Sequence, residues 1–326
     1  MNELALAVFA ATRDEHACDR EARTQRFAAF ERSFDAGAYV SALGERGVRW
    51  LGRSDAGFPA RLRAIHDPPP GLFLRGAADA ELLGRCAVAV VGARSCSDYG
   101  AHVARALARD IAAAGVVVVS GLARGVDGWA HRGALETGVT VAVLGCGIDR
   151  DYPRAHGALA AQIVSSGLVV SEYPPGVAPA PWRFPARNRI VAGLAAATVV
   201  VEARERSGAL ITADLALEEG RDVLAVPGEI TSALSAGTNA LLRLGAVPVT
   251  CAADVLEAVG IEPAVHPTDE PPSGNAGAAL AALDAGARTA DEVVRSTGLA
   301  PAAVAAALTE LELAGLVTAA AGRYRR

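Results

Sequence analysis

Seven short, mainly apolar runs recur through the middle of this 326-residue sequence and constrain its fold more than any other feature. They begin at Ala87, Val116, Val139, Leu168, Ala197, Asp222 and Ala246. Patterns with the period of an amphipathic helix fill most of the gaps between them. Apolar runs without polar alternation are typical of parallel strands that are buried on both faces. The sequence therefore predicts an α/β fold with a doubly wound, mainly parallel sheet.

The clearest unit of this kind runs from Ala87 to Asp127, where two apolar runs flank a helical pattern. Each run ends in a turn that combines glycine, small hydroxyl residues and one arginine. The residues concerned are Arg94, Ser95 and Ser97 in the first turn and Ser120 and Arg124 in the second. Open α/β sheets bind ligands beyond the carboxyl ends of their strands, and such turns can direct backbone N–H groups at a phosphate. We therefore expect an anion-binding site at these two turns.

A third cluster of functional side chains lies in the segment RFPARNR. It combines the ring of Phe184 with the polar residues Arg183, Arg187, Asn188 and Arg189. Cations bind phosphates and unpaired bases stack on aromatic rings, so this combination is typical of binding to single-stranded nucleic acid. The alternative is a helix start whose arginines pair with the acidic residues at positions 172 and 202. The two interpretations are compatible.

A dinucleotide cofactor finds little support in the first turn. Its sequence, GARSCSDYG, lacks the second and third glycines of the dinucleotide fingerprint at the required spacing. The second strand ends in Ser120, where a dinucleotide-binding fold places an acidic residue that holds the ribose. We therefore expect no nucleotide cofactor.

Catalytic and metal-binding motifs are also missing from the sequence. It contains neither G-x-S-x-G nor H-E-x-x-H, and its five cysteines lack paired spacing. His131, close to Asp127, is expected to be an ordinary helix residue that faces solvent or a backbone carbonyl. Asp127 is expected to cap its own turn, and Glu202 to anchor the loop at Ser207 and Gly208. We predict no catalytic residue and no metal.

The formal net charge of −5 is unevenly distributed, so it does not by itself exclude nucleic acid. Every basic residue is arginine. Residues 85–251 contain 15 arginines against 14 acidic residues, whereas residues 252–326 contain 5 against 10. We therefore expect nucleic acid to bind the central region and the acidic tail to be repelled by it.

A smaller module is indicated near the C-terminus. Thr289 and Glu292 form a capping-box pattern, Pro301 suits the first turn of a helix, and a short hairpin is expected after Leu316. Three helices and a hairpin predict a winged helix. Its candidate recognition helix carries acidic residues and no arginine, which disfavours sequence-specific readout of duplex DNA.

These patterns divide the chain into an N-terminal helical, SAM-like domain with a lead-in (1–80), a Rossmann-like DNA-binding domain (81–260), a linker (261–277) and a winged-helix-like domain (278–326). Within the first segment, three prolines at 68–70 cannot continue a helix, so Gly71–Gly76 is expected to be an extended lead-in to the sheet. No run approaches the roughly 20 apolar residues of a membrane span, and the N-terminus lacks the basic region of a secretory leader. We expect a cytoplasmic protein without membrane contact.

Five motifs, in this order, resemble those of the DprA (Smf) family of DNA-processing proteins: GARSCSDYG, SGLARGVD, FPARNRIVAGL, SGALITADLALEEGRDVLAVPG and GTNALLRLGA. They lie between Phe58 and Thr250, and several independent motifs in order are far more specific than a single Gly-rich loop. The resemblance implies an extended Rossmann fold, often with an N-terminal helical domain and a C-terminal winged helix.

The same resemblance implies a site and partners. Members of the family bind single-stranded DNA, load the RecA recombinase onto it during natural transformation, and act as homodimers. By position, the DNA-binding residues are expected to be Arg94, Ser95, Gly121, Arg124, Arg183, Phe184, Arg187, Asn188 and Arg189. The residues expected to shape the site are Ser97, Tyr99, Gly100, Asp127, Glu202, Ser207, Gly208 and Thr212. We expect a non-enzymatic protein that protects incoming single strands and passes them to a recombinase.

Two other functions stay open. One is a nucleotide-processing enzyme similar to phosphoribohydrolases, in which Glu202 and Arg187 would act on a ribose phosphate. Such enzymes usually carry P-G-G-x-G-T-x-x-E, whereas here the Gly-Thr pair is displaced and the matching acid is missing. The other is a duplex-specific regulator that binds DNA through its tail.

Overall fold

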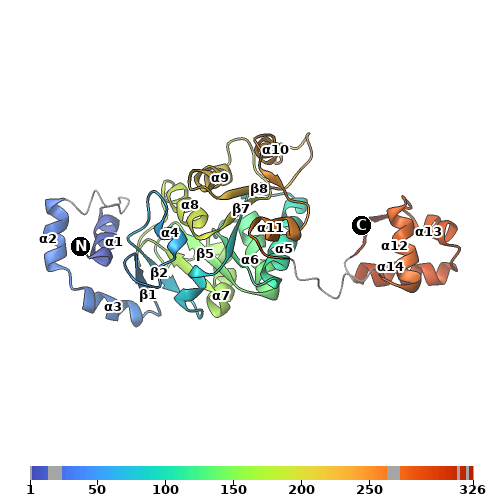
Figure 1. The fold of residues 1–326 in the computed structure, drawn as a ribbon. Helices are drawn as coiled ribbons and strands as arrows, with labels where there is room; N and C mark the ends of the chain where they lie inside the picture. The colour runs from blue at the N-terminus through green and yellow to red at the C-terminus, as the bar shows by residue number, and fades with distance from the viewer. Residues whose placement is uncertain (1, 14–23, 263–271, 314–315, 321–322, 326) are drawn as a thin grey trace. The chain divides into compact units, whose positions relative to one another are not determined.

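The computed structural model describes residues 2–13, 24–262, 272–313, 316–320 and 323–325. It divides into two compact units, Met1–Pro263 and Ala264–Arg326. The first unit is built around one large sheet, and the second contains three helices and a small hairpin (Figure 1).

Nine strands form the large sheet, in the order β1-β2-β6-β5-β4-β3-β7-β8-β9. Their bounds are β1 Arg49–Gly52, β2 Gly71–Arg75, β3 Ala87–Val91, β4 Val117–Ser120, β5 Thr140–Leu144, β6 Leu168–Ser171, β7 Ala197–Val200, β8 Asp222–Ala225 and β9 Val247–Pro248. The strands from β6 to β9 in this order are parallel, whereas β2 pairs antiparallel with both β1 and β6. The predicted mainly parallel sheet is confirmed, and each of the seven apolar runs contains a strand.

The strand order reverses between β3 and β7. From β3 the chain adds β4, β5 and β6 on one side, and it then returns to add β7, β8 and β9 on the other. In register, Val91 pairs with Val200, and Ala89 pairs with both Thr198 and Val119. The carboxyl ends of β3, β4 and β7 therefore meet at a topological switch point, the position where α/β sheets bind ligands.

Helices cover both faces of this sheet. Those that matter for the first unit are α4 Ala60–Arg63, α5 Asp98–Ala113, α6 Val126–Thr137, α7 Gly157–Ser166, α8 Arg183–Leu194, α9 Gly208–Glu218, α10 Ala236–Arg243 and α11 Ala252–Ala258. Successive strand residues point to opposite faces. Ala89 and Val91 therefore pack in the cluster that contains residues of α4, α8 and α9, whereas Val88 and Val90 pack with α5, α6 and α11. Burial on both faces explains why the strands are continuous apolar runs.

The N-terminal helices α1 (Glu3–Thr12), α2 (Gln25–Ser33) and α3 (Ala36–Gly44) join the sheet through its antiparallel edge. Phe9 packs against Phe27 and Phe30, with ring centroids 5.6 and 5.4 Å apart. The expected extended lead-in is strand β2, which pairs with β6. Strand β1 was not predicted from the sequence, because its four residues are too few to show alternation.

The second unit contains helices α12 (Gly274–Asp284), α13 (Ala290–Thr297) and α14 (Pro301–Leu313) and the antiparallel strands β10 (Thr318–Ala320) and β11 (Arg323–Arg325). The capping box at Thr289 and Glu292 and the helix start at Pro301 are confirmed. Helix α12 begins inside the stretch expected to be a linker, and most of that stretch lies outside the described residues. None of the helices in the described ranges is long and apolar enough to cross a membrane.

Candidate nucleic-acid interface

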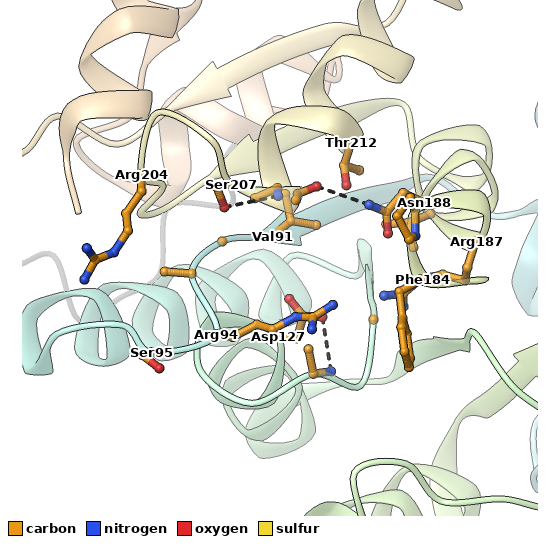
Figure 2. Close-up of a pocket in the computed structure, with 18 of the residues that line it drawn as sticks. Val91, Arg94, Ser95, Asp127, Phe184, Arg187, Asn188, Arg204, Ser207 and Thr212 are labelled. Atoms are coloured by element: carbon orange, nitrogen blue, oxygen red, sulfur yellow. Dashed lines mark hydrogen bonds between the residues drawn. The ribbon is translucent and has the colours of Figure 1, made fainter. Parts of the chain in front are cut away.

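A cavity of about 540 Å³ lies at the switch point, where β3, β4 and β7 end (Figure 2). Its walls come from the first turn, the second turn, the start of α8 and the loop between β7 and α9. The polar residues and the ring that line it are Arg94, Ser95, Asp127, Phe184, Arg187, Asn188, Arg204, Arg206, Ser207 and Thr212. The structure thus brings together four segments that are separate in the sequence.

Exposed arginines surround this cavity. Arg94, Arg204 and Arg206 line it and are exposed, and none of them forms an ion pair with another residue in the described part of the chain. Figure 2 shows Arg204 at the opposite end of the cavity from Phe184. The cavity therefore has cations along its length that are available to an anionic ligand. Sequence reasoning missed Arg204 and Arg206, although both directly follow the end of a predicted strand, as the arginines of the other turns do.

A buried pair of opposite charges forms the floor of the cavity. The Arg187 guanidinium donates to the carbonyl oxygen of Val143, and burial lowers its pKa. Burial raises the pKa of the Asp127 carboxyl, while the charge of Arg187 and a 3.3 Å hydrogen bond from the Ala123 N–H act in the opposite direction. Asp127 thus holds its own turn, as expected, and it also offsets part of the buried positive charge.

Gly121 separates these two charged groups. A Cβ atom at this position would overlap both the guanidinium of Arg187 and the carboxylate of Asp127. Gly125, at the start of α6, has a φ of +77°, and a Cβ there would overlap the carbonyl oxygen of Ala93. Both glycines of the second turn are therefore required by close approach, and the Gly125 backbone is also in a region that disfavours a side chain.

Glu202 holds the first turn in place. Its carboxylate accepts hydrogen bonds from the backbone N–H of Ser97, at 2.9 Å, and from the Ser97 hydroxyl. The Ser97 hydroxyl also accepts from the Gly100 N–H and so caps α5. A Cβ at Gly100 would overlap this carboxylate. The expectation that Glu202 anchors the loop at Ser207 is therefore wrong, because its carboxylate is occupied by the turn that follows β3.

The start of α9 is held by other groups. Ser207 caps the helix by accepting from the Ala209 N–H, and the Asn188 side chain donates to the Gly208 carbonyl oxygen at 3.2 Å. Thr212 is buried one turn further along and lines the cavity. The N-terminus of an 11-residue helix thus faces the same space as the arginines, and the positive end of its dipole favours an anion there.

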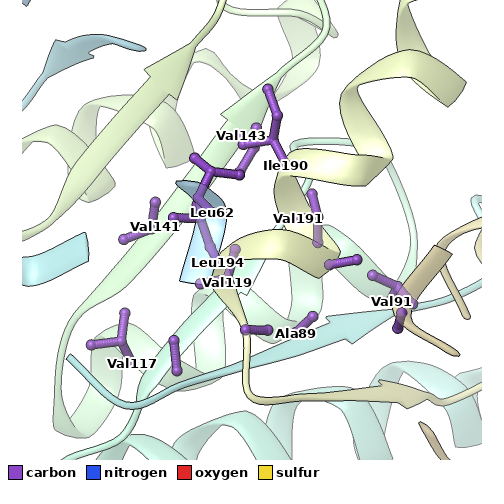
Figure 3. Packing of buried hydrophobic residues seen from close by; sticks show 14 of the residues in the cluster. Leu62, Ala89, Val91, Val117, Val119, Val141, Val143, Ile190, Val191 and Leu194 are labelled. Atoms are coloured by element: carbon purple, nitrogen blue, oxygen red, sulfur yellow. The ribbon is translucent and has the colours of Figure 1, made fainter. Parts of the chain in front are cut away.

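Helix α8 has an apolar face that packs in the core and polar residues that line the cavity. Ile190, Val191 and Leu194 bury one face of the helix against Val143 and neighbouring strand residues (Figure 3). Arg187 and Asn188 face the cavity. This packing fixes how the helix is rotated, and with it which arginines can reach a ligand.

Arg183 and Arg189 were expected to bind DNA, but they line neither this cavity nor the smaller one beside it. Arg189 donates to both oxygens of Glu172, at 2.9 and 2.7 Å, and pairs with Asp67 at 3.0 Å. Arg183 is buried, with its guanidinium carbon 5.1 Å from the ring of Tyr173. In an α-helix, residues two positions apart point about 200° apart around the axis, so Arg187 and Arg189 face different sides. The alternative interpretation, an ion pair with Glu172, describes Arg189 correctly.

The other expected residues lie nearby. Arg124 does not line the large cavity and instead lines a smaller one beside it, with Arg94, Phe184 and Tyr152. Tyr99 is exposed, lines neither cavity, and donates to the carbonyl oxygen of Pro227 at 3.2 Å. Sequence reasoning did not single out Tyr152.

His131 contacts the backbone of the second turn but does not line the cavity. It is completely buried, with Nε2 2.6 Å from the carbonyl oxygen of Gly121 and Nδ1 2.7 Å from the Thr140 hydroxyl oxygen. Burial lowers its pKa to about 4. The expectation that it faces a backbone carbonyl is correct. In the described ranges of the chain no three His, Cys, Asp or Glu side chains gather as a metal site would require.

Comparison with known protein families divides the chain close to the boundary between its two compact units. Residues 49–260 match the family described as DNA recombination-mediator protein A, and residues 262–323 match the DprA winged helix domain. A relative from Mycobacterium tuberculosis is 46% identical over 280 residues, which cover 83% of this chain and 72% of that protein. Protein Smf of Escherichia coli is 40% identical over 283 residues, covering 82% and 75%.

Two solved structures share this fold. DNA processing protein A of Streptococcus pneumoniae has a TM-score of 0.66 and 37% identity, over 78% of this chain and 92% of that one. DNA processing protein A of Helicobacter pylori has a TM-score of 0.59 and 30% identity, over 65% and 95%, and its structure was described for its single-stranded DNA binding mode. The predicted fold and the predicted winged helix are both confirmed.

Proposed function

The chain belongs to the DprA family of DNA-processing proteins, and on this premise we propose that it binds single-stranded DNA in the arginine-lined cavity and loads a RecA-type recombinase onto the strand. In this proposal the protein is not an enzyme. It acts in the cytoplasm as a homodimer, and it protects incoming single strands during natural transformation or recombination. The family resemblance supports the recombinase, the dimer and the compartment, and the geometry of the site supports the ligand.

The observation that carries the proposal is the group of exposed arginines around one cavity. Arg94, Arg204 and Arg206 form no ion pair with a carboxylate of the described residues, and the N-terminus of α9 adds the positive end of its helix dipole. Phosphates bind such groups through charge-assisted hydrogen bonds. Because the cavity also contains an aromatic ring, it provides for the bases as well as for the backbone of a nucleic acid.

The depth of the cavity favours a single strand over a duplex. Arg187 lies at its floor and is buried, and Phe184 is only partly exposed. A base can reach this depth only when it is unstacked from a partner strand, and a duplex would contact the exposed rim alone. Single strands meet this condition without the cost of unpairing.

The experiment that tests the proposal replaces two exposed cavity arginines, Arg94→Gln and Arg204→Gln, in one chain. Arg187 is left intact because its loss would leave Asp127 buried without its main compensating charge. We expect the double variant to bind an oligo-dT at least tenfold more weakly. The slope of log affinity against log salt should fall by about 0.7 for each lost phosphate contact.

A matched control removes the same number of charges elsewhere. Arg46 and Arg154 are exposed and line neither cavity, so Arg46→Gln with Arg154→Gln should bind like the wild type. Equal affinities and equal salt slopes for the two double variants would disprove the assignment of the cavity.

The phosphoribohydrolase alternative loses its proposed acid. Glu202, which would act on a ribose phosphate, is buried and already accepts two hydrogen bonds from Ser97. It serves to hold a turn, so we expect no release of free base from nucleoside monophosphates. Turnover that disappears in Arg94→Gln would favour this alternative.

A further inference from the structure

A second cavity, of about 240 Å³, adjoins the first. Arg94, Phe184 and Arg187 line both cavities and so form the wall between them. The rest of the smaller cavity is lined by the second turn, by the end of β5 and by Tyr152, Pro153 and Ala155 of the following loop. One aromatic ring and one exposed arginine, Tyr152 and Arg124, belong to this cavity alone.

Phe184 already has two stacking partners. The ring of Tyr152 lies 5.5 Å away with an angle of 29° between the ring planes, and the guanidinium carbon of Arg94 lies 5.4 Å from the centre of the Phe184 ring. Tyr152, by contrast, is 45% exposed. The larger free aromatic surface in this part of the site therefore belongs to Tyr152, and Phe184 supports it.

The loop that carries Tyr152 is held at both ends. Asp151 forms an ion pair with Arg75 of β2, and the Nδ1 of His156 lies 3.0 Å from the carbonyl oxygen of Leu122 in the second turn. The exposed ring is thus presented on a fixed segment. A ligand that stacks on it loses little free energy to the ordering of the protein.

Arg124 supplies the charge on this side. It is exposed on the second turn, and no carboxylate in the described part of the chain pairs with it. The arginines connect the two cavities. Arg204 and Arg206 line the large cavity alone, Arg94 and Arg187 line both cavities, and Arg124 lines the smaller cavity alone. A polyanion that follows these charges passes from one cavity into the other.

We propose that the smaller cavity is a separate nucleotide subsite, in which a base stacks on Tyr152 and the guanidinium of Arg124 binds the adjacent phosphate. It accepts a nucleotide next to the one in the large cavity, and the wall of Arg94 and Phe184 separates the two bases. This inference rests on the proposed function, since the same DNA strand would occupy both cavities.

The test measures the affinity of the full chain for an oligo-dT ladder from 2 to about 10 nucleotides. Base stacking on an aromatic side chain contributes about 1–3 kcal/mol, so Tyr152→Leu should weaken binding about 5- to 150-fold for oligonucleotides that fill both cavities. The loss should be smaller for the shortest oligonucleotides, which the large cavity can hold alone. Tyr152→Phe keeps the ring and should restore the affinity of the long oligonucleotides.

A second variant tests the phosphate contact. Arg124→Gln should lower the salt slope by about 0.7, whereas Arg154→Gln, two residues after Tyr152 and outside both cavities, should leave it unchanged.

The outcomes separate this inference from the proposed function. A wild type that binds no single-stranded DNA overturns both. If the wild type binds and Tyr152→Leu matches it at every length, or loses the same factor at every length, the second subsite is wrong while the large cavity stands. A loss that grows with length and is restored by Tyr152→Phe supports the subsite.

Discussion

The two arginines at positions 187 and 189 show how far residue types alone can predict a site. Both belong to the same positively charged motif, and both were expected to bind DNA. Arg187 lines the cavity, whereas Arg189 is held by Glu172 and Asp67. The composition of the segment gives no sign of this difference, because it depends on how the helix is rotated against the sheet. That rotation is set by the packing of Ile190 and Leu194.

Tyr152 was missed for a different reason. It is a single aromatic residue in a loop more than 30 residues before Phe184, and a lone tyrosine in a loop carries no periodic or motif signal. Only the fold brings its ring to within stacking distance of Phe184. Arg204 and Arg206 could have been found, because the rule that ligands bind where parallel strands end applies to them as it does to Arg94 and Arg124.

His131 leads to a prediction on stability and pH. Burial lowers its pKa in the folded chain to about 4, against an ordinary value of 6.5. Between these values the unfolded chain binds a proton that the folded chain excludes, so stability rises with pH in this range. Between pH 5 and pH 7 this residue should contribute about 2 kcal/mol to the rise. His131→Gln, which keeps a hydrogen-bonding side chain at this position, should therefore show a smaller rise.

The measurement is urea unfolding at pH 5 and at pH 7, with tryptophan fluorescence as the signal. All three tryptophans lie in the first unit, so the signal reports on the unit that contains His131. An identical pH dependence in the wild type and the variant would contradict the assigned pKa.

At the scale of the elements, most of the sheet could be predicted because its strands are buried on both faces. A run such as Ala87–Val91 is uninterrupted by polar residues, which is typical of a strand that is buried on both faces. The serines at positions 97 and 207 mark the starts of the helices that follow β3 and β7. Short edge strands carry a weaker signal. Strand β1 has four residues of mixed burial, and only its pairing with β2 identifies it as a strand.

The connection between β7 and the first turn gives a second prediction. Ser97→Ala should destabilise the chain by about 1 kcal/mol as a helix cap is lost. Because Ser97 and Glu202 form two hydrogen bonds, Ser97→Ala and Glu202→Gln should show a coupling energy of about 0.5–3 kcal/mol in a double-mutant cycle of urea unfolding.

Ser207 provides the matched control, since it also caps a helix but forms no hydrogen bond with Glu202. Its substitution by alanine should be additive with Glu202→Gln. The opposite pattern, with coupling of Glu202 to Ser207 and none to Ser97, would support the expectation from the sequence that Glu202 anchors the loop at Ser207.

At the scale of the whole molecule, the charge is divided between the two parts of the chain. The net charge of −5 would argue against a nucleic-acid ligand if it were spread evenly, but residues 252–326 contain 10 acidic residues and only 5 arginines. The exposed arginines that define the candidate site all belong to Met1–Pro263. We therefore expect DNA binding to be a property of the first unit, and the acidic winged helix to serve another purpose.

The most direct test compares the affinity of this protein for single-stranded and duplex DNA of equal length, at two salt concentrations. It uses the full chain and a chain that ends at Pro263, the end of the first compact unit. The account predicts that both chains bind the single strand at least tenfold more tightly than the duplex, and that both affinities fall with salt. Equal or tighter binding of the duplex, or loss of single-strand binding in the shorter chain, would contradict it.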